Sequence, residues 1–360
     1  MLEKDGQKIM GLGGRGGVMR ARREPSIRDI ARLAKVSHPT VSRALHNSPR
    51  VNAQTAARIR KIADEAGYCA SALARGLVTR RTQTIGLVVT TVADPFASEV
   101  ICGIEQVAND RGYRVFLGSS HADPERERKV VRSFAEQRVD GIIVISSRVG
   151  TLYLPLLAEM MVPIVLVNDQ YAGTFVHSVM IGNLEGARAA ASHLAGLGHR
   201  RIAYLGDRLG YQSDIDRLAG YRKALRTAGI PFDARLVVYG EGRPETTIRA
   251  MESLLALHRP PTAVCCYDDL SALGAMRVIR GRGLRVPEDV SITGFDDLFF
   301  APYTQPALTT VHQPMRQMGQ MAMESLLKLM SGEAPVPQIK VDATLVVRES
   351  TAKVKAASRR

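Results

Sequence analysis

Residues 26–47 of this chain read SIRDIARLAKVSHPTVSRALHN, and they decide the fold of its N-terminal part. Ser26 and Asp29 have the spacing of a capping box, in which each side chain binds the backbone N–H of the other residue at the start of a helix. Ile27 and Ile30 then begin an apolar face with helical spacing. The pattern predicts a short helix that starts directly after Ser26.

A second short helix is predicted after a tight turn. Ser37 is placed to cap it, and Pro39 falls in its first turn, where the missing N–H of proline costs little. Val41 and Ala44 are spaced to face the first helix. The outer surface then carries His38, Pro39, Thr40, Ser42 and Arg43. This arrangement is typical of a helix-turn-helix, whose second helix lies in the DNA major groove, although a helical hairpin with a solvated charged face has the same pattern.

Positive charge is concentrated at the N-terminus. The chain carries a net charge of +14, and residues 1–82 hold 17 Lys and Arg against 6 Asp and Glu. Residues 353–360 hold four more basic residues and no acid, so that residues 83–352 are almost neutral, at −1. A basic segment joined to a neutral body is the charge distribution expected when a nucleic-acid-binding module is fused to a domain of another kind.

Composition bounds the class of protein. With 360 residues and 45% hydrophobic content, the chain is large enough for two or three domains. No uncharged apolar run is long enough to span a membrane, and no apolar signal sequence is found at the N-terminus. The cysteines have no metal-ligand spacing, so we expect reduced thiols, a cytoplasmic location and no metal site; they are Cys69, Cys102, Cys265 and Cys266.

Residues 52–82 are expected to contain a third helix and a hinge. Asn52 can cap a helix that ends at Gly67. The segment 71–77, SALARGL, is too short to be a stable isolated helix in water, because helix nucleation is costly. It is therefore expected to fold only against a partner.

The pattern changes after Thr84. Apolar runs alternate with amphipathic helical stretches, and they occupy residues 85–89, 115–117, 142–145, 164–167, 202–205, 237–239, 263–266 and 291–294. Strands buried on both faces and separated by helices are typical of parallel α/β sheets. The runs form two groups of similar size, which predicts two doubly wound lobes with a ligand cleft at the carboxyl ends of the strands.

Polar residues cluster where these strands are expected to end. They include Asp94, Ser146, Ser147, Asn168, Asp169, Asp207, Asp268, Asp269, Asp296 and Asp297. Many of them are expected to cap helices, Asp94 above all, since Pro95 follows it. No serine lies in a G-x-S-x-G motif and no histidine pair has metal spacing, which favours binding over catalysis and implies no cofactor.

Eight motifs follow one another along residues 26–350: IRDIA (27–31), VSHPTVSRAL (36–45), ALARGL (72–77), VDGII (139–143), GHRRI (198–202), RLAGY (217–221), VPEDVS (286–291) and LTTV (308–311). In sequence and in order they resemble the lactose-repressor (LacI/GalR) family of bacterial transcription regulators. The resemblance implies an all-α helix-turn-helix DNA-binding domain at 26–70, a hinge helix and linker at 71–82, and a two-lobed domain of the periplasmic-binding-protein type at 83–352.

The resemblance also implies how the two-lobed domain is divided. It binds the effector and forms the dimer, with an N-lobe at about 83–182 and 314–341 and a C-lobe at about 183–313 and 342–352. Residues 1–25 lie outside the resemblance and are expected to form a disordered basic arm. Residues 353–360 are a basic tail, too short for the apolar heptad helix of the family's tetramers, which favours a dimer.

Family positions that contact DNA carry over to this chain by motif. The implied base contacts are His38, Pro39 and Arg43, of which Arg43 can form a bidentate contact with guanine. The implied phosphate contacts are Ser37, Thr40, Asn47, Arg50 and Thr55. Ala74 and Leu77 match the hinge positions in the minor groove, where an apolar wedge unstacks a base step.

Family positions that contact the effector carry over in the same way. They are Phe96, Ser147, Asn168, Ser213, Arg217, Asp268 and Asp296. Charged and amide groups of this kind suit the hydroxyl groups of a sugar, and an aromatic ring can pack against its apolar face. The purine-responsive branch has an aromatic residue in place of Gly242 and an arginine in place of Tyr211, so a purine effector is disfavoured.

The implied function is that of a repressor in the bacterial cytoplasm, bound to the nucleoid, which recognises a palindromic operator as a homodimer. A small molecule, sugar-like by the chemistry of the cleft, would gate it. The alternatives are a corepressor-activated or purine-responsive regulator and, more remotely, a periplasmic-type solute-binding protein or a sugar-modifying enzyme. The solute-binding protein would need a signal sequence, and the enzyme a phosphate loop, a metal cluster or an acid–base pair.

Overall fold

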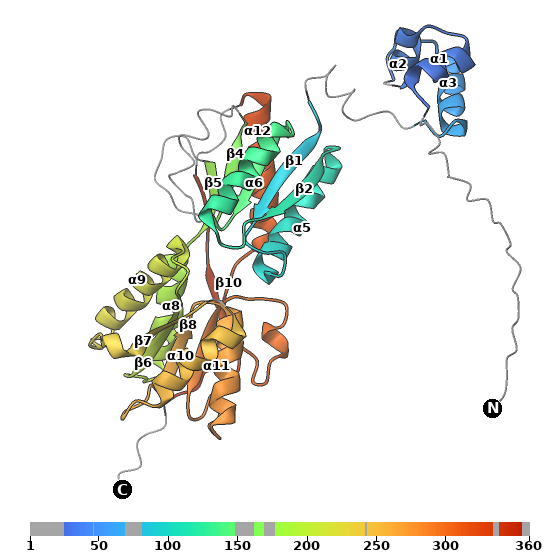
Figure 1. The fold of residues 1–360 in the computed structure, drawn as a ribbon. Coiled ribbons are helices and arrows are strands. Elements are labelled where there is room, and N and C mark those ends of the chain that lie inside the picture. The colour runs from blue at the N-terminus through green and yellow to red at the C-terminus, as the bar shows by residue number, and fades with distance from the viewer. Residues whose placement is uncertain are drawn as a thin grey trace, which may run out of the picture. The chain divides into compact units, whose positions relative to one another are not determined.

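The computed structural model describes residues 25–45, 47–68, 81–147, 162–168, 177–241, 243–333 and 338–354. The chain divides into two compact units, Met1–Arg80 and Arg81–Arg360. Figure 1 shows the first unit as a group of helices and the second as an α/β body with two sheets.

The first unit packs its helices around a small apolar core. They are α1 (Ile27–Ala34), α2 (His38–Leu45) and α3 (Ala53–Glu65). The predicted capping box is confirmed, because the Ser26 hydroxyl accepts the Asp29 N–H and the Asp29 carboxylate accepts the Ser26 N–H at 2.9 Å. Ile30, Val41 and Ile59, from the three helices in turn, are completely buried together. The predicted helix-turn-helix fold is therefore confirmed.

The N-lobe of the second unit is a parallel sheet with the strand order β11-β5-β4-β3-β1-β2. Its strands are β1 (Thr84–Val89), β2 (Arg114–Ser119), β3 (Gly141–Ile145), β4 (Ile164–Val167), β5 (His177–Ile181) and β11 (Gln338–Val341). Its helices are α5 (Pro95–Asp110), α6 (Pro124–Glu136) and α12 (Met315–Ser331). The completely buried β1 and β3 lie in the interior of this sheet, each between two other strands, as their apolar runs predict.

The C-lobe has the strand order β12-β10-β9-β8-β6-β7. Its strands are β6 (Ile202–Asp207), β7 (Val237–Gly240), β8 (Ala263–Cys266), β9 (Ser291–Asp296), β10 (Thr309–His312) and β12 (Thr344–Val346). Its helices are α8 (Asn183–Gly196), α9 (Gln212–Thr227), α10 (Pro244–Leu255) and α11 (Asp269–Gly281), with short 3₁₀ turns η2 (Ala234–Leu236) and η3 (Ala301–Tyr303). The sheet is parallel except for β12, which pairs antiparallel with β10 at the edge.

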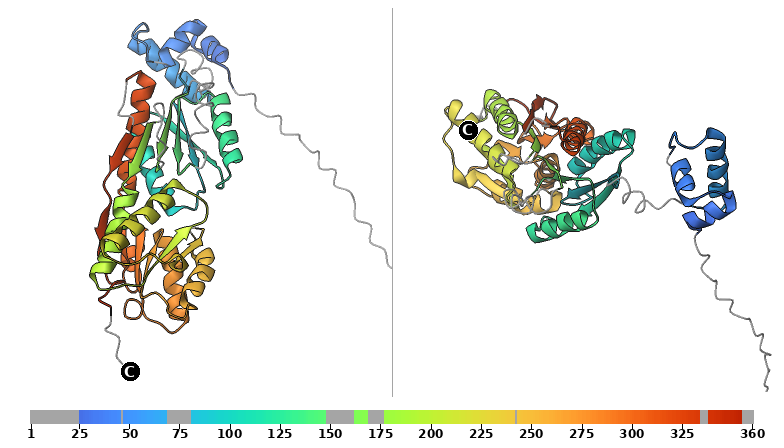
Figure 2. Two further views of the ribbon diagram at one scale, coloured as in Figure 1. Left: turned by 90° about the vertical axis from the view of Figure 1, so that its left-hand side faces the viewer. Right: turned by 90° about the horizontal axis from the view of Figure 1, so that it is seen from above.

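The chain passes between the two sheets three times in its described part. It leaves β5 for α8, β10 for α12 and β11 for β12. Figure 2 shows the two sheets one beyond the other along the length of this unit, with the crossing segments between them. Asn183 begins α8 and Gln313 follows β10, so both side chains start from crossing segments.

A loop of the C-lobe also reaches the core of the N-lobe. Leu298, which follows β9, is buried within the N-lobe core cluster. Asp269 holds this loop, since its carboxylate accepts the Leu298 N–H at 2.7 Å and the Thr310 hydroxyl at 2.5 Å. The lobes are therefore joined by side-chain packing as well as by the crossing segments.

Two negative findings apply to the described residues. None of their helices is long and apolar enough to cross a membrane. They also contain no group of three or more His, Cys, Asp or Glu side chains arranged to hold a metal ion. The described cysteines, Cys102, Cys265 and Cys266, are free thiols.

Glycine permits close helix packing in both lobes. A Cβ atom on Gly319 of α12 would overlap the Val100 carbonyl oxygen of α5, and one on Gly103 would overlap the Arg316 carbonyl oxygen. In the C-lobe, a Cβ atom on Gly220 of α9 would meet the backbone of α8 in the same way. Since backbone atoms cannot rotate aside as side chains do, these contacts require glycine.

Gly319→Ala is expected to destabilise the second unit by about 1–3 kcal/mol, because the added methyl group must push α5 and α12 apart. Urea unfolding followed by circular dichroism measures the change. Gly196→Ala is the matched control, because no atom lies within 4 Å of its added Cβ. The control should be neutral or stabilising by up to about 1 kcal/mol, as alanine favours the helix. Equal stability of the two variants would contradict the proposed close packing.

Candidate DNA-binding and effector sites

The predicted base-contacting residues lie on the exposed side of α2. His38, Pro39 and Arg43 are all exposed, while Val41 and Ala44 on the opposite side are buried. Pro39 and Arg43 are four residues apart, which places them next to each other on the helix surface. The helix therefore presents these three side chains to solvent at and near its N-terminal end.

The predicted phosphate-contacting residues surround α2 and the start of α3. The Ser37 hydroxyl accepts the Thr40 N–H at 3.4 Å and lies 2.8 Å from the Thr40 hydroxyl, so Ser37 caps α2. Asn47 and Arg50 are exposed in the turn between the helices, and Asn47 has a positive φ of 52°. Thr55 is half-buried in the first turn of α3. Ala74 and Leu77 of the predicted hinge lie outside the described residues.

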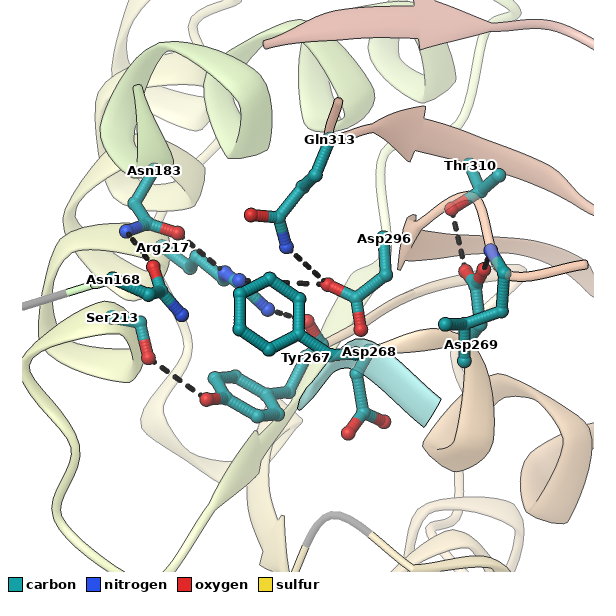
Figure 3. A network of polar contacts seen from close by, with 12 residues as sticks. Asn168, Asn183, Ser213, Arg217, Tyr267, Asp268, Asp269, Asp296, Thr310 and Gln313 are labelled. Atoms are coloured by element: carbon teal, nitrogen blue, oxygen red, sulfur yellow. Dashed lines mark hydrogen bonds and ion pairs between the residues drawn. The ribbon is translucent and has the colours of Figure 1, made fainter. Parts of the chain in front are cut away.

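In the second unit, a buried arginine gathers polar groups from several strand ends. The Arg217 side chain projects from α9, and its Nε donates to Asn183 Oδ1 at 2.9 Å. One terminal nitrogen donates to the Tyr267 carbonyl at 2.6 Å, and the other lies 3.7 Å from Asp296 Oδ1. The guanidinium also lies over the Phe295 ring, 3.7 Å from its centroid. Figure 3 shows these groups converging from α8, α9 and the ends of β8 and β9.

Asp296, the last residue of β9, receives a second contact from a crossing segment. Gln313 Nε2 donates to its carboxylate, and Figure 3 shows Gln313 reaching towards Asp296 from its own segment. The backbone of Asp296 has φ 117°, a left-handed conformation that costs energy for a residue with a side chain. Burial raises the pKa of Asp296 well above its ordinary value, although the charge of Arg217 opposes the shift.

Asp268 has a structural role as well as a place in the network. Its carboxylate accepts the Ser271 N–H at 2.7 Å and caps α11, so it is one of the strand-end acids that act as caps. Asp94 caps α5 as predicted, by accepting the Phe96 N–H at 3.0 Å. Burial raises the pKa of both carboxyl groups, that of Asp94 to about 6, and the negative charge of Asp268 adds to the shift of Asp94.

The remaining predicted effector contacts occupy different surroundings. The Ser213 hydroxyl lies 2.8 Å from the Tyr267 hydroxyl, inside the same network. Asn168 approaches it from the end of β4, where its Oδ1 lies 3.5 Å from Asn183 Nδ2. The Ser147 hydroxyl donates to the buried carboxylate of Glu127 at 2.5 Å. Phe96 is only 6% exposed and packs mainly within the N-lobe core.

Sequence reasoning missed Asn183, Tyr267 and Gln313. None of them stands in a motif that signals chemistry, and the contacts of each are with residues more than 14 positions away in the chain. The one available signal was position, because Tyr267 follows a buried apolar run directly. Tyr211, where the purine-responsive branch has arginine, lies with its hydroxyl 3.5 Å from that of Thr90 in the N-lobe. Gly242 lies outside the described residues.

Comparisons with known proteins agree with this organisation. Residues 26–71 match the family described as bacterial regulatory proteins, lacI family, and residues 191–351 match the periplasmic binding protein-like domain. The transcriptional repressor CytR of Escherichia coli K12 is 36% identical over 332 residues, which cover 91% of this chain and 96% of that protein.

Two solved structures are similar over most of the chain. One is the lac repressor dimer bound to operator and the anti-inducer ONPF, with a TM-score of 0.85 and 29% identity over 92% of this chain and all of that one. The other is the transcriptional regulator CelR in complex with cellobiose, with a TM-score of 0.69 and 33% identity over 91% of this chain and all of that one.

The fold and the comparisons indicate the same family over nearly the whole sequence. The chain has a helix-turn-helix unit and a two-sheet body, and its relatives are named as repressors. The chain therefore belongs to the lacI family of bacterial regulatory proteins and is a helix-turn-helix regulator of transcription.

Proposed function

We propose that this regulator is a repressor which binds a palindromic operator as a homodimer and responds to a small sugar-like molecule between its two lobes. The observation that carries the DNA-binding part is the exposure of His38, Pro39 and Arg43 on α2, opposite its buried side. Two such helices in a dimer would enter successive major grooves, which matches a palindromic site. The lac repressor relative was solved as an operator-bound dimer, which supports this assembly.

Each proposed DNA contact has a distinct task. Arg43 would read guanine through its guanidinium, and Pro39, which cannot donate, would make apolar contact with a base. A second group of residues would bind phosphates and position α2 without reading the base sequence. They are Ser37, Thr40, Asn47, Arg50 and Thr55. Leu77, with Ala74 beside it, would enter the minor groove at the operator centre, once the hinge 71–82 folds against DNA.

The proposed effector site lies at the carboxyl ends of the strands of both sheets. The C-lobe contributes Arg217, Asp268, Asp296 and Ser213 to this site, and the N-lobe contributes Asn168, Ser147 and Phe96. This is the place where doubly wound sheets bind ligands. The CelR relative holds cellobiose, which supports a sugar as the class of effector here.

Coupling between effector and DNA requires that the ligand prefer one arrangement of the lobes. Asn183 and Gln313 stand on crossing segments and contact Arg217 and Asp296 respectively. An inducer would stabilise the arrangement that separates the two hinges of the dimer, and a corepressor the opposite one. Either way, the regulator would act on operator DNA in the bacterial cytoplasm.

Arg43→Ala tests the recognition helix. Loss of a bidentate contact with guanine is expected to lower the ratio of specific to non-specific affinity by about 5–150-fold for each half-site, since such a contact contributes about 1–3 kcal/mol of discrimination. Fluorescence anisotropy measures this ratio, with a duplex selected from random DNA by the wild-type protein and a scrambled duplex. Arg60→Ala removes the same charge from the exposed surface of α3 and should leave the ratio unchanged. An unchanged ratio for Arg43→Ala would show that another residue reads the sequence.

Asp296→Asn tests the effector site. The change keeps the size of the side chain but replaces one carboxyl oxygen with an amide nitrogen, which cannot accept a hydrogen bond, so the affinity for the effector is expected to fall at least tenfold. Titration of operator complexes with cellobiose and a panel of monosaccharides measures the response, and operator affinity without sugar should stay within about twofold. Asp110→Asn, at the exposed end of α5, is the control. A full response in Asp296→Asn would place the effector elsewhere.

A further inference from the structure

The outer edge of the C-lobe sheet is flanked by two surface hollows. β7 is the edge strand, since it pairs with β6 and no other strand in the described part of the chain lies beside it. A hollow of about 510 Å³ lies against α9, and one of about 650 Å³ lies against α10. Tyr239 of β7 is exposed and lines both of them. We call the two hollows and the edge of β7 between them the β7 groove.

The two hollows lie on opposite faces of the sheet. Val238 packs against the core cluster that contains Met251 of α10, and its neighbour Val237 packs against the cluster that contains Leu225 of α9. Because successive side chains of a strand point to opposite faces, α9 and α10 cover opposite faces of β7. An extended chain laid beside β7 would therefore direct its own side chains alternately into the two hollows.

The β7 groove has a surplus of positive charge. Its exposed cations form no ion pair with any other described residue, and they are Arg208, Arg222, Lys223, Arg226 and Arg249. Glu241 and Glu245 are the exposed carboxylates that line the groove. Asp214 also lines it but is buried, and its carboxylate accepts the Tyr204 hydroxyl at 2.7 Å. More cations than carboxylates are thus available to a binding partner.

This charge is local, and apolar side chains accompany it. Residues 208–249 hold eight Lys and Arg against five Asp and Glu, although residues 83–352 as a whole carry −1. Ile215 is exposed in the hollow against α9. The guanidinium of Arg222 lies 4.6 Å from the ring centroid of Phe232, which is also exposed. Exposed apolar groups together with arginine and aromatic side chains are typical of protein–protein interfaces.

We propose that the β7 groove docks an extended acidic segment of a partner protein, which adds as a strand to the edge of β7. In this mode of recognition, main-chain hydrogen bonds to an edge strand give affinity and pockets for alternate side chains give specificity. Asp and Glu side chains of the segment would meet the unpaired cations on both faces of the sheet.

Two other occupants fit the groove less well. A second copy of this chain that paired β7 with β7 would bring like charges together, which is unfavourable. The phosphates of a nucleic acid would neutralise the cations but would leave Ile215 and Phe232 without apolar partners. An acidic peptide segment can satisfy both the charged and the apolar side chains.

A selection of short random peptides displayed on phage tests the proposal. The full chain is the bait, and an excess of scrambled duplex DNA occupies the helix-turn-helix unit. We expect the selected peptides to be rich in Asp and Glu and to bind more weakly as salt is raised, because exposed charges are screened. Hydrogen exchange at residues 237–240 should slow when such a peptide binds. A selection without acidic binders, or protection confined to other segments, would overturn the proposal.

A pair of substitutions on α9 identifies the cations that bind the peptide. Arg222→Gln with Arg226→Gln is expected to weaken a selected acidic peptide by about fivefold or more, since two exposed charge pairs are lost. Fluorescence anisotropy measures the affinity. Arg222→Lys with Arg226→Lys keeps both charges and should retain most of it. A lysine pair as weak as the glutamine pair would contradict the electrostatic explanation.

The matched control removes two charges from another exposed helix surface. Lys129→Gln with Arg132→Gln does so on α6 and should leave the affinity for the peptide unchanged. Circular dichroism verifies that each variant is folded. An equal loss of affinity in the α6 pair and the α9 pair would show a general effect of net charge and would contradict docking in the β7 groove.

Affinity for scrambled duplex DNA separates a nucleic acid from the proposed partner. The glutamine pair on α9 should bind this duplex within about twofold of the wild-type protein, because the basic helix-turn-helix unit supplies the phosphate contacts. A fall comparable to the loss of peptide affinity would assign the β7 groove to nucleic acid and overturn the proposal.

Discussion

The buried guanidinium of Arg217 is the interaction on which the site depends most. A charge removed from water must be paired and hydrogen-bonded, or its desolvation is not repaid. Arg217 meets that requirement with Asn183, the Tyr267 carbonyl and Asp296, which belong to a crossing segment and two strand ends. Any ligand that binds there must work around this pairing, because breaking it would leave a buried charge uncompensated. The arginine therefore sets the geometry of this network, which is the effector site under the proposed function.

The same network lies where the two lobes are joined. Gln313 follows β10 on one crossing segment and contacts Asp296, while Leu298 from the loop after β9 packs in the N-lobe core. Asp269 anchors that loop through the Leu298 N–H. Under the proposed function, a ligand that contacts Asp296 would act on groups of the C-lobe and of a crossing segment. This gives a physical route from binding to a change in lobe arrangement, which a regulator needs if its ligand is to alter its affinity for DNA.

Much of the fold was predictable because its signals are local. The capping box of Ser26 and Asp29 needs only three residues of spacing, and strands such as β1 and β3 are continuous apolar runs. The continuous apolar runs of the sequence did not predict the strands β5, β10, β11 and β12. The edge strands β11 and β12 contain exposed and half-buried residues without a buried run. They form because each pairs with a neighbouring strand, β11 with β5 and β12 with β10. Such pairing depends on residues far away in the chain and leaves no local pattern.

The sequence by itself determined the helix-turn-helix, the α/β class of the body and the family of regulators, since periodicity, caps and motifs are properties of short segments. It also named Arg217, Asp268 and Asp296 as candidates for one site. Only the tertiary structure decided that Arg217 is already paired, that Asp268 caps α11, and that Gln313 has an acceptor without a partner. Burial and hydrogen bonding are set by residues that meet in space from distant segments. The pairing of these buried groups could therefore emerge only after folding.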